Sequence, residues 1–184
     1  MQFVQCAVQK PPACVCRPAV AMSHVVSPLR IQQCPGRIFR LKTELLVPQR
    51  VEEVFAFFSD AHNLETITPG WLGLRILTPG PIEMGVGARI HYRFRLRGIS
   101  ARWDSEITAW EPPLRFVDEQ RRGPFRSWVH EHTFLARDGH TIARDDVWYV
   151  VPGGRLLHDL FVRQDLERLF SYRHAKLTTM FQRT

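Results

Sequence analysis

Acidic residues are absent from the first 43 positions of this 184-residue chain. The Lys and Arg residues of that segment carry almost all of the formal net charge of +7, so the rest of the chain is close to neutral. A nucleic-acid-binding domain needs a basic patch on its folded part, and the patterned part of this chain lacks the charge for one. We therefore expect no nucleic-acid partner.

Cysteine is absent from every position after residue 34. Because all four cysteines lie near the N-terminus, disulfides cannot hold the later part of the chain together. Their irregular spacing, with no histidine pair close by, does not match a structural zinc site. These cysteines are Cys6, Cys14, Cys16 and Cys34. A chain of this length is expected to fold as one domain with its own core.

Long apolar runs are also missing. None approaches the ~20 residues that span a bilayer, so a transmembrane helix is excluded and we expect no membrane insertion. Gln and Lys residues interrupt the opening segment, where a secretory signal would need an apolar stretch. A cytoplasmic location is therefore expected.

Prolines divide residues 1–36 and prevent a helix there. With little patterned apolar sequence to bury, this segment is predicted to be a disordered extension, and Met22 is an alternative start. Residues 37–184 are predicted to form the domain. A chain that starts at Arg37 is then expected to keep the melting temperature of the full chain.

Apolar and polar residues begin to alternate at Ile38, which predicts a half-buried strand up to Val47. Pro48 ends this strand. The apolar residues of 51–58 then recur at helical spacing, with two glutamates in the first turn, where the helix dipole favours acids. A second short helix is predicted for residues 60–69.

Turns and strands dominate the middle of the chain, and a helical pattern closes it. Gly and Pro turn signals separate predicted strands at residues 72–77, 88–96, 100–110, 115–120, 127–137 and 141–151. Neither Gly nor Pro occurs after Gly154, and apolar residues recur at helical spacing up to Phe181, with a break near Arg163. This order indicates an α+β domain whose curved antiparallel sheet wraps the last helix.

One hairpin has a turn short enough to predict its register. A two-residue turn at residues 97–98 places Tyr92 opposite Trp103 on one face of the sheet. On the other face the same register places His91 opposite Asp104 and Arg89 opposite an acid. The row of arginines on this strand is therefore interpreted as a solvated face.

A second hairpin, centred on residues 138–139, collects the side chains that could carry chemistry. Its predicted register places Trp128 opposite Tyr149, His130 opposite Val147, His132 opposite Asp145, and Phe134 opposite Ala143, all on one face. Titratable groups with ready partners are how pockets acquire perturbed pKa values. We expect this face to point inward, and we expect Asp145 to raise the pKa of His132 against the opposing effect of burial.

Three interpretations of this cluster stay open. His132 and Asp145 can form a structural hydrogen-bonded pair, or they can be the polar end of an aromatic ligand pocket. Alternatively, His130, His132 and Asp145 can supply the two imidazoles and one carboxylate of a metal site. The metal is the least favoured, because H-x-H recurs by chance and aromatic residues flank it on the same face. No metal and no cofactor are therefore expected.

Motifs for other chemistries are missing. The sequence has no nucleophile elbow, and its cysteines lie outside the patterned part, so a serine or cysteine nucleophile has no support. A Gly-rich phosphate loop is also absent, because Gly85-Val86-Gly87 lacks the third glycine and precedes a strand.

Four segments resemble the SRPBCC or START-like (Bet v 1-like) superfamily. They read V-E-E-V-F-A-F-F-S-D at 51–60, G-P-F-x-x-W-x-H-x-H-x-F at 123–134, D-x-V-x-Y at 145–149 with Pro-Gly behind it, and F-x-Y-R at 170–173. Within the superfamily the chain is most similar to bacterial ligand-binding proteins related to polyketide cyclase/dehydrase and coenzyme Q-binding domains.

This resemblance implies a helix-grip fold, in which a curved seven-stranded antiparallel sheet surrounds a long C-terminal helix and leaves an internal apolar cavity. It also implies that the partner is a small hydrophobic molecule, such as a lipid, an isoprenoid or an aromatic polyketide. The expected ligand-binding residues are Tyr92, Trp103, Trp128, His130, His132, Phe134, Asp145, Tyr149 and Arg173.

Two alternatives to a binding protein stay open. One is an enzyme of the cyclase or dehydratase type, in which His132, kept basic by Asp145, acts as general base and Tyr149 as acid. The other is a protein-interaction module, which predicts a filled cavity and an exposed apolar patch. A homodimer is compatible with each of these functions.

Overall fold

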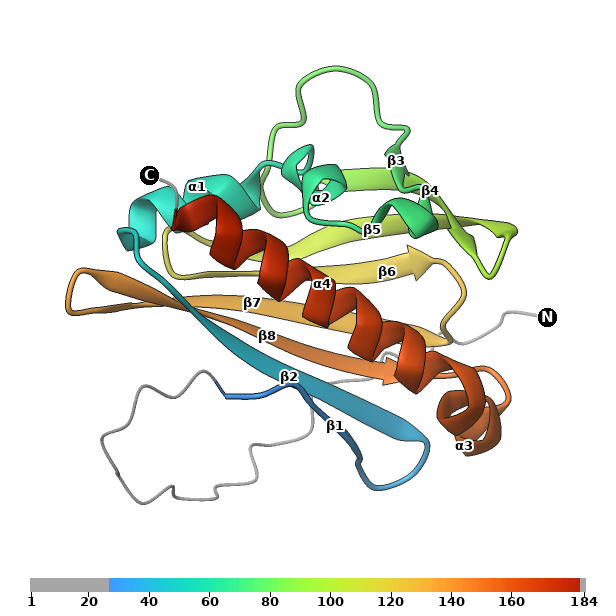
Figure 1. The fold of residues 1–184 in the computed structure, drawn as a ribbon. Coiled ribbons are helices and arrows are strands. Elements are labelled where there is room, and N and C mark those ends of the chain that lie inside the picture. The colour runs from blue at the N-terminus through green and yellow to red at the C-terminus, as the bar shows by residue number, and fades with distance from the viewer. Residues whose placement is uncertain (1–26, 183–184) are drawn as a thin grey trace.

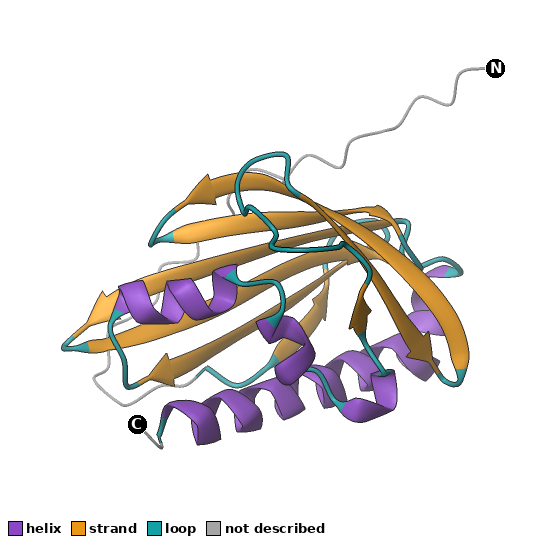
Figure 2. Ribbon diagram, turned by 90° about the horizontal axis from the view of Figure 1, so that it is seen from above, coloured by secondary structure: helices purple, strands orange, loops and turns teal. Residues whose placement is uncertain are grey.

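The computed structural model describes residues 27–182, which form one curved antiparallel sheet with the helices gathered on its concave side (Figures 1 and 2). The strands are β1 (Arg30–Gln33), β2 (Ile38–Val47), β3 (Arg75–Ile76), β4 (Arg89–Leu96), β5 (Ile99–Glu111), β6 (Arg115–Arg122), β7 (Ser127–Arg137) and β8 (His140–Val150). Their order across the sheet is β1-β2-β8-β7-β6-β5-β4-β3. The predicted helix-grip fold is confirmed, but the described residues contribute eight strands instead of the predicted seven.

The helical elements are α1 (Val51–Ser59), α2 (Asn63–Thr66), the 3-10 turn η1 (Gly70–Leu72), α3 (Gly154–Leu157), the π-helical segment η2 (His158–Val162) and α4 (Arg163–Phe181). Figure 1 shows α4 running diagonally across the sheet, with α1 near its C-terminal end. The π-helical segment lies where the sequence predicted a break in the last helix. No helix within residues 27–182 is both long and apolar enough to cross a membrane.

Both hairpin registers predicted from the sequence are confirmed. Tyr92 pairs with Trp103 across β4 and β5, and His132 pairs with Asp145 across β7 and β8. In each of these turns two successive residues have positive φ, as the type I′ geometry of a two-residue hairpin requires. Because these turns leave no freedom in the pairing, the side chains of β4, β5, β7 and β8 are assigned to their faces without ambiguity.

The inward face of α4 determines how the helix fits against the sheet. Its buried residues are Leu166, Phe170, Arg173 and Leu177, which recur every three or four positions and so form one stripe. Three of them are apolar and pack into the core. The fourth, Arg173, is a charged residue at a position of the buried stripe where an apolar residue is expected.

Strand β1 lies inside the segment that was expected to be a disordered extension. Its residues pair with residues 39–42 of β2, and Leu29 and Ile31 pack against the core cluster that contains Phe39. The sheet therefore begins before the predicted boundary at residue 36, because two apolar side chains in a Pro-containing stretch were enough to add an edge strand. The rest of the predicted extension, residues 1–26, lies outside the described residues, as do three of the four cysteines. Cys34 is a free, partly exposed thiol.

We now predict that a chain starting at Arg37 melts about 5 °C lower than a chain starting at Ser27. The shorter chain loses the β1–β2 pairing and the partial burial of Leu29 and Ile31, which together contribute about 1–2 kcal/mol. For a domain of this size, each 1 kcal/mol shifts the melting temperature by about 2–4 °C. Thermal unfolding of the two purified chains measures the difference, and equal melting temperatures would show that β1 adds nothing to stability.

Candidate functional site

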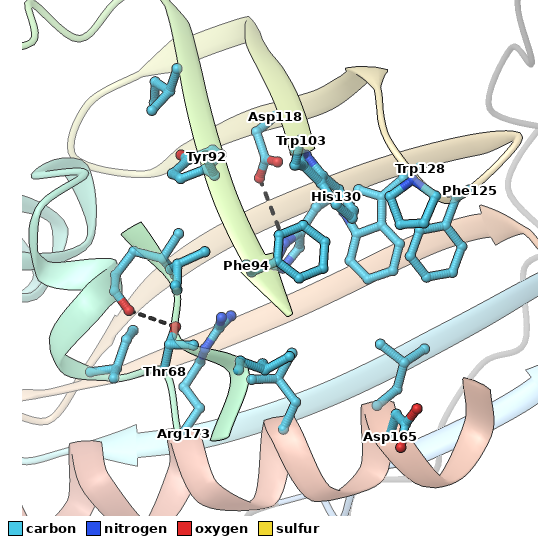
Figure 3. Close-up of a pocket in the computed structure, with 18 of the residues that line it drawn as sticks. Thr68, Tyr92, Phe94, Trp103, Asp118, Phe125, Trp128, His130, Asp165 and Arg173 are labelled. Carbon is cyan, nitrogen blue, oxygen red and sulfur yellow. Dashed lines mark hydrogen bonds and ion pairs between the residues drawn. The ribbon is translucent and has the colours of Figure 1, made fainter. Parts of the chain in front are cut away.

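A pocket of about 410 Å³ lies between the concave face of the sheet and α4. Figure 3 shows side chains from the sheet and from α4 converging on this space. Its volume is within the range of about 300–1,000 Å³ that small-molecule sites occupy. The pocket therefore has room for a small molecule between the sheet and the last helix.

Aromatic side chains make up much of the pocket wall. Trp103 and Trp128 meet edge to face with their ring centroids 5.2 Å apart, and the ring of Phe125 packs 4.8 Å from that of Trp128. Phe94 adds a fourth ring, 6.1 Å from Trp103. These contacts hold the rings in fixed orientations, so the wall offers a preformed apolar surface to a flat or branched molecule.

Two elements meet at the rim of the pocket. Arg97, in the β4–β5 turn, donates two hydrogen bonds of 3.1 Å to the carboxylate of Asp165 on α4. The same guanidinium lies 4.7 Å from the ring centre of Phe161 in η2. We call this contact the rim clasp, because it joins the tip of the hairpin to the start of the last helix.

The polar end of the pocket is built by three neighbouring strands. Asp118 of β6 lies opposite His130 of β7, and Asp145 of β8 lies opposite His132 of β7. Since all four side chains point to the concave face, each carboxylate is directly across from one histidine and diagonal to the other. We call these four residues the carboxylate–imidazole cluster.

Each imidazole of the cluster lies between the two carboxylates. Asp145 Oδ1 is 2.8 Å from His130 Nε2 and 3.0 Å from His132 Nδ1, the second of these not in line for a hydrogen bond. On the pocket side, Asp118 Oδ2 is 3.3 Å from His132 Nε2 and 3.6 Å from His130 Nδ1. Ser105 donates a 3.0 Å hydrogen bond to the other oxygen of Asp118. Every ring nitrogen of the pair thus faces a carboxylate oxygen.

The two histidines respond to this environment in opposite directions. Burial lowers the pKa of His132, but its hydrogen bond to Asp118 and the negative charges of Asp118 and Asp145 outweigh burial, so its pKa is raised. For His130, burial together with the positive charge of His132 prevails, and its pKa is lowered. Burial raises the pKa of each carboxylate, yet bonding to the histidines leaves both below the usual value. The arrangement favours protonated His132 beside neutral His130.

Arg173 enters the pocket from α4 (Figure 3). Its side chain is only 6% exposed, its Nε has no hydrogen-bond partner, and none of residues 27–182 forms an ion pair with it. The central carbon of its guanidinium lies 5.1 Å from the ring centre of Phe170, one turn earlier on α4. Because guanidinium nitrogens only donate hydrogen bonds, Arg173 brings into the pocket lining a donor group whose buried Nε–H has no acceptor among residues 27–182.

Six of the nine expected ligand-binding residues line the pocket and three do not. Those that line it are Tyr92, Trp103, Trp128, His130, His132 and Arg173. Phe134 packs instead in the core against Phe55, with ring centroids 5.6 Å apart. Asp145 lies behind the histidines, and Tyr149 uses its hydroxyl on His158, 3.0 Å away. Tyr149 is therefore not placed to protonate a molecule in the pocket.

Asp118 is the member of the carboxylate–imidazole cluster that was not predicted from the sequence, and Phe94, Phe125, Arg97 and Asp165 of the pocket lining were not predicted either. The strand of Asp118 was predicted, but its register against β7 passes through the loop at residues 123–126, which is not a two-residue turn. The alternation of Phe116 and Asp118 was the only available signal, because it puts the aspartate on the same face as a buried aromatic residue. This alternation does not predict which of the two histidines Asp118 contacts.

We predict that Asp145→Asn lowers the pKa of His132, because it removes one of the two negative charges that stabilise the imidazolium. A raised folded-state pKa contributes stability that is fully present below the unfolded value of ~6.5 and is lost as pH rises through the folded pKa. The wild type should therefore lose some stability as pH rises above that value, and the variant should lose less.

NMR titration of the histidine rings in chelator-treated protein measures this change. The matched control is Asp104→Asn, because Asp104 contacts His91 on the exposed outer face of the sheet and should leave His132 unaffected. An unchanged His132 titration in Asp145→Asn would contradict the electrostatic coupling described above.

Comparisons with known proteins agree with this architecture. Residues 47–173 match the family model described as polyketide cyclase / dehydrase and lipid transport. No match was found among curated proteins.

Solved structures with the same fold have low sequence identity to this chain. Protein Ms6760 from Mycobacterium smegmatis aligns with a TM-score of 0.62 and 15% identity over 84% of this chain and 98% of its own. TTHA0849 from Thermus thermophilus aligns with a TM-score of 0.58 and 19% identity, over 77% of this chain and 98% of its own. Major latex-like protein 151 from Panax ginseng aligns with a TM-score of 0.51 and 16% identity, over 72% and 97%.

These likenesses show a shared fold, whereas the family match spans more than half of the sequence. The family match confirms the resemblance to the SRPBCC or Bet v 1-like superfamily, and the solved structures confirm its fold. The chain belongs to the polyketide cyclase / dehydrase and lipid transport family.

Proposed function

We propose that this protein binds one small apolar molecule with a hydrogen-bond-accepting end, in the class of lipids, isoprenoids or aromatic polyketides. The observation that carries the proposal is Arg173, a buried donor without an ion-pair partner among residues 27–182, in a pocket whose other walls are largely aromatic. A buried charge costs free energy unless it is compensated, and an oxygen atom of the ligand would supply the missing acceptor. The apolar body of the ligand would then lie along Trp103 and Trp128.

The pocket supports a binding function over a protein-interaction module. An interaction module was expected to have a filled cavity, whereas the pocket of this protein leaves room for a ligand. The cytoplasmic location and the homodimer that the sequence suggested stay predictions and do not enter this argument.

A second candidate function is acid–base catalysis in the same pocket. His132 lines the pocket beside two carboxylates, and this supports a role in proton transfer. Its raised pKa suits the role of an acid better than the base first expected. Tyr92 would replace Tyr149 as the phenol in contact with the ligand, since burial raises the pKa of Tyr92 and keeps its proton in place.

We predict that 2-naphthol, used as an apolar probe, changes the tryptophan fluorescence on binding and that Trp128→Ala weakens its binding about tenfold. The variant removes the stacking surface that Trp128 offers at the pocket wall. Trp148→Phe is the matched control, because Trp148 lies on the outer face under the guanidinium of Arg40, 4.1 Å away. A probe that responds equally to both variants would be bound at the outer surface, which contradicts the proposal.

A further prediction concerns the polar end of the ligand. We expect Arg173→Met to reduce the preference of the pocket for 2-naphthol over naphthalene by about 10–100-fold, because a hydrogen bond to a charged donor is lost. Arg173→Lys retains a charged donor and should retain part of the preference. Titration calorimetry of both compounds with the three proteins measures it. An equal loss of affinity for the two compounds would show that Arg173 supports the pocket without contacting the ligand.

A further inference from the structure

Three side chains of the carboxylate–imidazole cluster converge on one point at the pocket surface. Asp118, His130 and His132 each offer a ligating atom, and the three atoms lie within 4.8 Å of one another. From Asp118 Oδ2 the distance is 3.3 Å to His132 Nε2 and 3.6 Å to His130 Nδ1. Atoms that share a metal ion at about 2.1 Å are separated by about 3–3.5 Å, so a small adjustment of these side chains would allow all three to bind one ion.

The fourth member of the cluster braces this triad from behind. Asp145 accepts a 2.8 Å hydrogen bond from His130 Nε2. The proton of that ring therefore resides on Nε2, and the lone pair of Nδ1 is directed toward Asp118. Asp145 also lies 3.0 Å from the far nitrogen of His132. At metal centres, a carboxylate that contacts the far nitrogen of a histidine ligand orients the ring and increases its basicity.

We propose that Asp118, His130 and His132 bind one divalent first-row transition metal ion, zinc or ferrous iron, with open coordination positions facing the pocket. Two imidazoles and one carboxylate suit these ions, whereas Mg²⁺ and Ca²⁺ require shells made mostly of oxygen. All three residues line the pocket, so a ligand oxygen or water can complete the coordination shell. The ion would also compensate the negative charges of the partly buried Asp118 and the buried Asp145.

This site differs from the one weighed on the sequence alone. In the site considered from the sequence, Asp145 was the carboxylate ligand beside the two histidines, and no metal was expected to bind. The structure places Asp145 on the side of the histidines away from the pocket and Asp118 on the side that lines it. With Asp145 as the carboxylate ligand, the site would be closed off from the pocket. With Asp118 instead, the three ligands face the pocket and are accessible from it.

The test uses the full chain, stripped with a chelator and titrated with Co²⁺ or Zn²⁺ alone. One equivalent of Co²⁺ should bind and produce visible d–d absorption. Thiolate ligation must be separated from this result, because the chain carries four cysteines. A variant in which Cys6, Cys14, Cys16 and Cys34 are all serine should therefore bind Co²⁺ with the same affinity and the same spectrum.

Single substitutions then locate the site. Asp118→Asn and His132→Gln should abolish binding of Co²⁺, and Asp145→Asn should weaken it by about 10–100-fold, as expected for a positioning residue. His91→Gln is the matched control, because His91 forms a similar pair with Asp104 on the exposed outer face. Equal losses in all four variants, or no loss in any of them, would overturn the proposal.

X-ray absorption spectroscopy of the Zn²⁺-loaded wild type identifies the atoms that bind the ion, and it does not depend on whether any variant folds. A shell of nitrogen and oxygen with the scattering pattern of two imidazoles is expected. Binding of no ion, or a shell that contains sulfur, would overturn the proposal. The result is independent of the proposed organic ligand, because the metal alone is the probe, and the 2-naphthol titration can succeed or fail on its own.

Discussion

The arrangement of the pocket depends on two carboxylates, one buried and one partly buried, that face two imidazoles across three neighbouring strands. A buried ion pair is not in itself a strong source of stability, but breaking one by removing a partner costs about 3–5 kcal/mol. Asp118 and Asp145 therefore hold β6, β7 and β8 to one relative alignment, since any slip in register would leave a charge unpaired in the core. The same constraint explains why polar side chains are tolerated on the concave face beside Phe116, which stacks on His132 at 4.3 Å.

The fold and the site differ in how far they could be predicted, and the turns explain the difference. Two-residue turns allow only one pairing, so the pairing of Tyr92 with Trp103 and that of His132 with Asp145 could be predicted once two-residue turns were assumed, whereas a three-residue bulged turn would have shifted the second pairing. Asp118 could not be assigned in the same way, because the loop between β6 and β7 permits several registers. The position of Asp145 behind the rings, and not in the pocket, depends on side-chain rotamers that no pattern encodes.

Two further features were beyond the sequence for other physical reasons. Strand β1 has only two apolar residues to bury and follows a proline, so its pairing with β2 is decided by an available sheet edge and not by local propensity. Arg173 occupies a regular position on the buried stripe of α4, but the pattern does not show whether a partner awaits it. That Arg173 has no ion-pair partner among residues 27–182 can be seen only in the folded structure, where every element around it is in place.

The rim clasp has a consequence for the kinetics of the pocket. Arg97 and Asp165 both line the pocket and are joined by two hydrogen bonds between partly exposed groups. A contact that is intact both in the free protein and after a ligand has settled cancels from the equilibrium affinity, and it contributes only to the barrier that separates the two states. Dissolved salt screens such an exposed pair. Ionic strength would then adjust how quickly ligands exchange while leaving how tightly they are held almost unchanged.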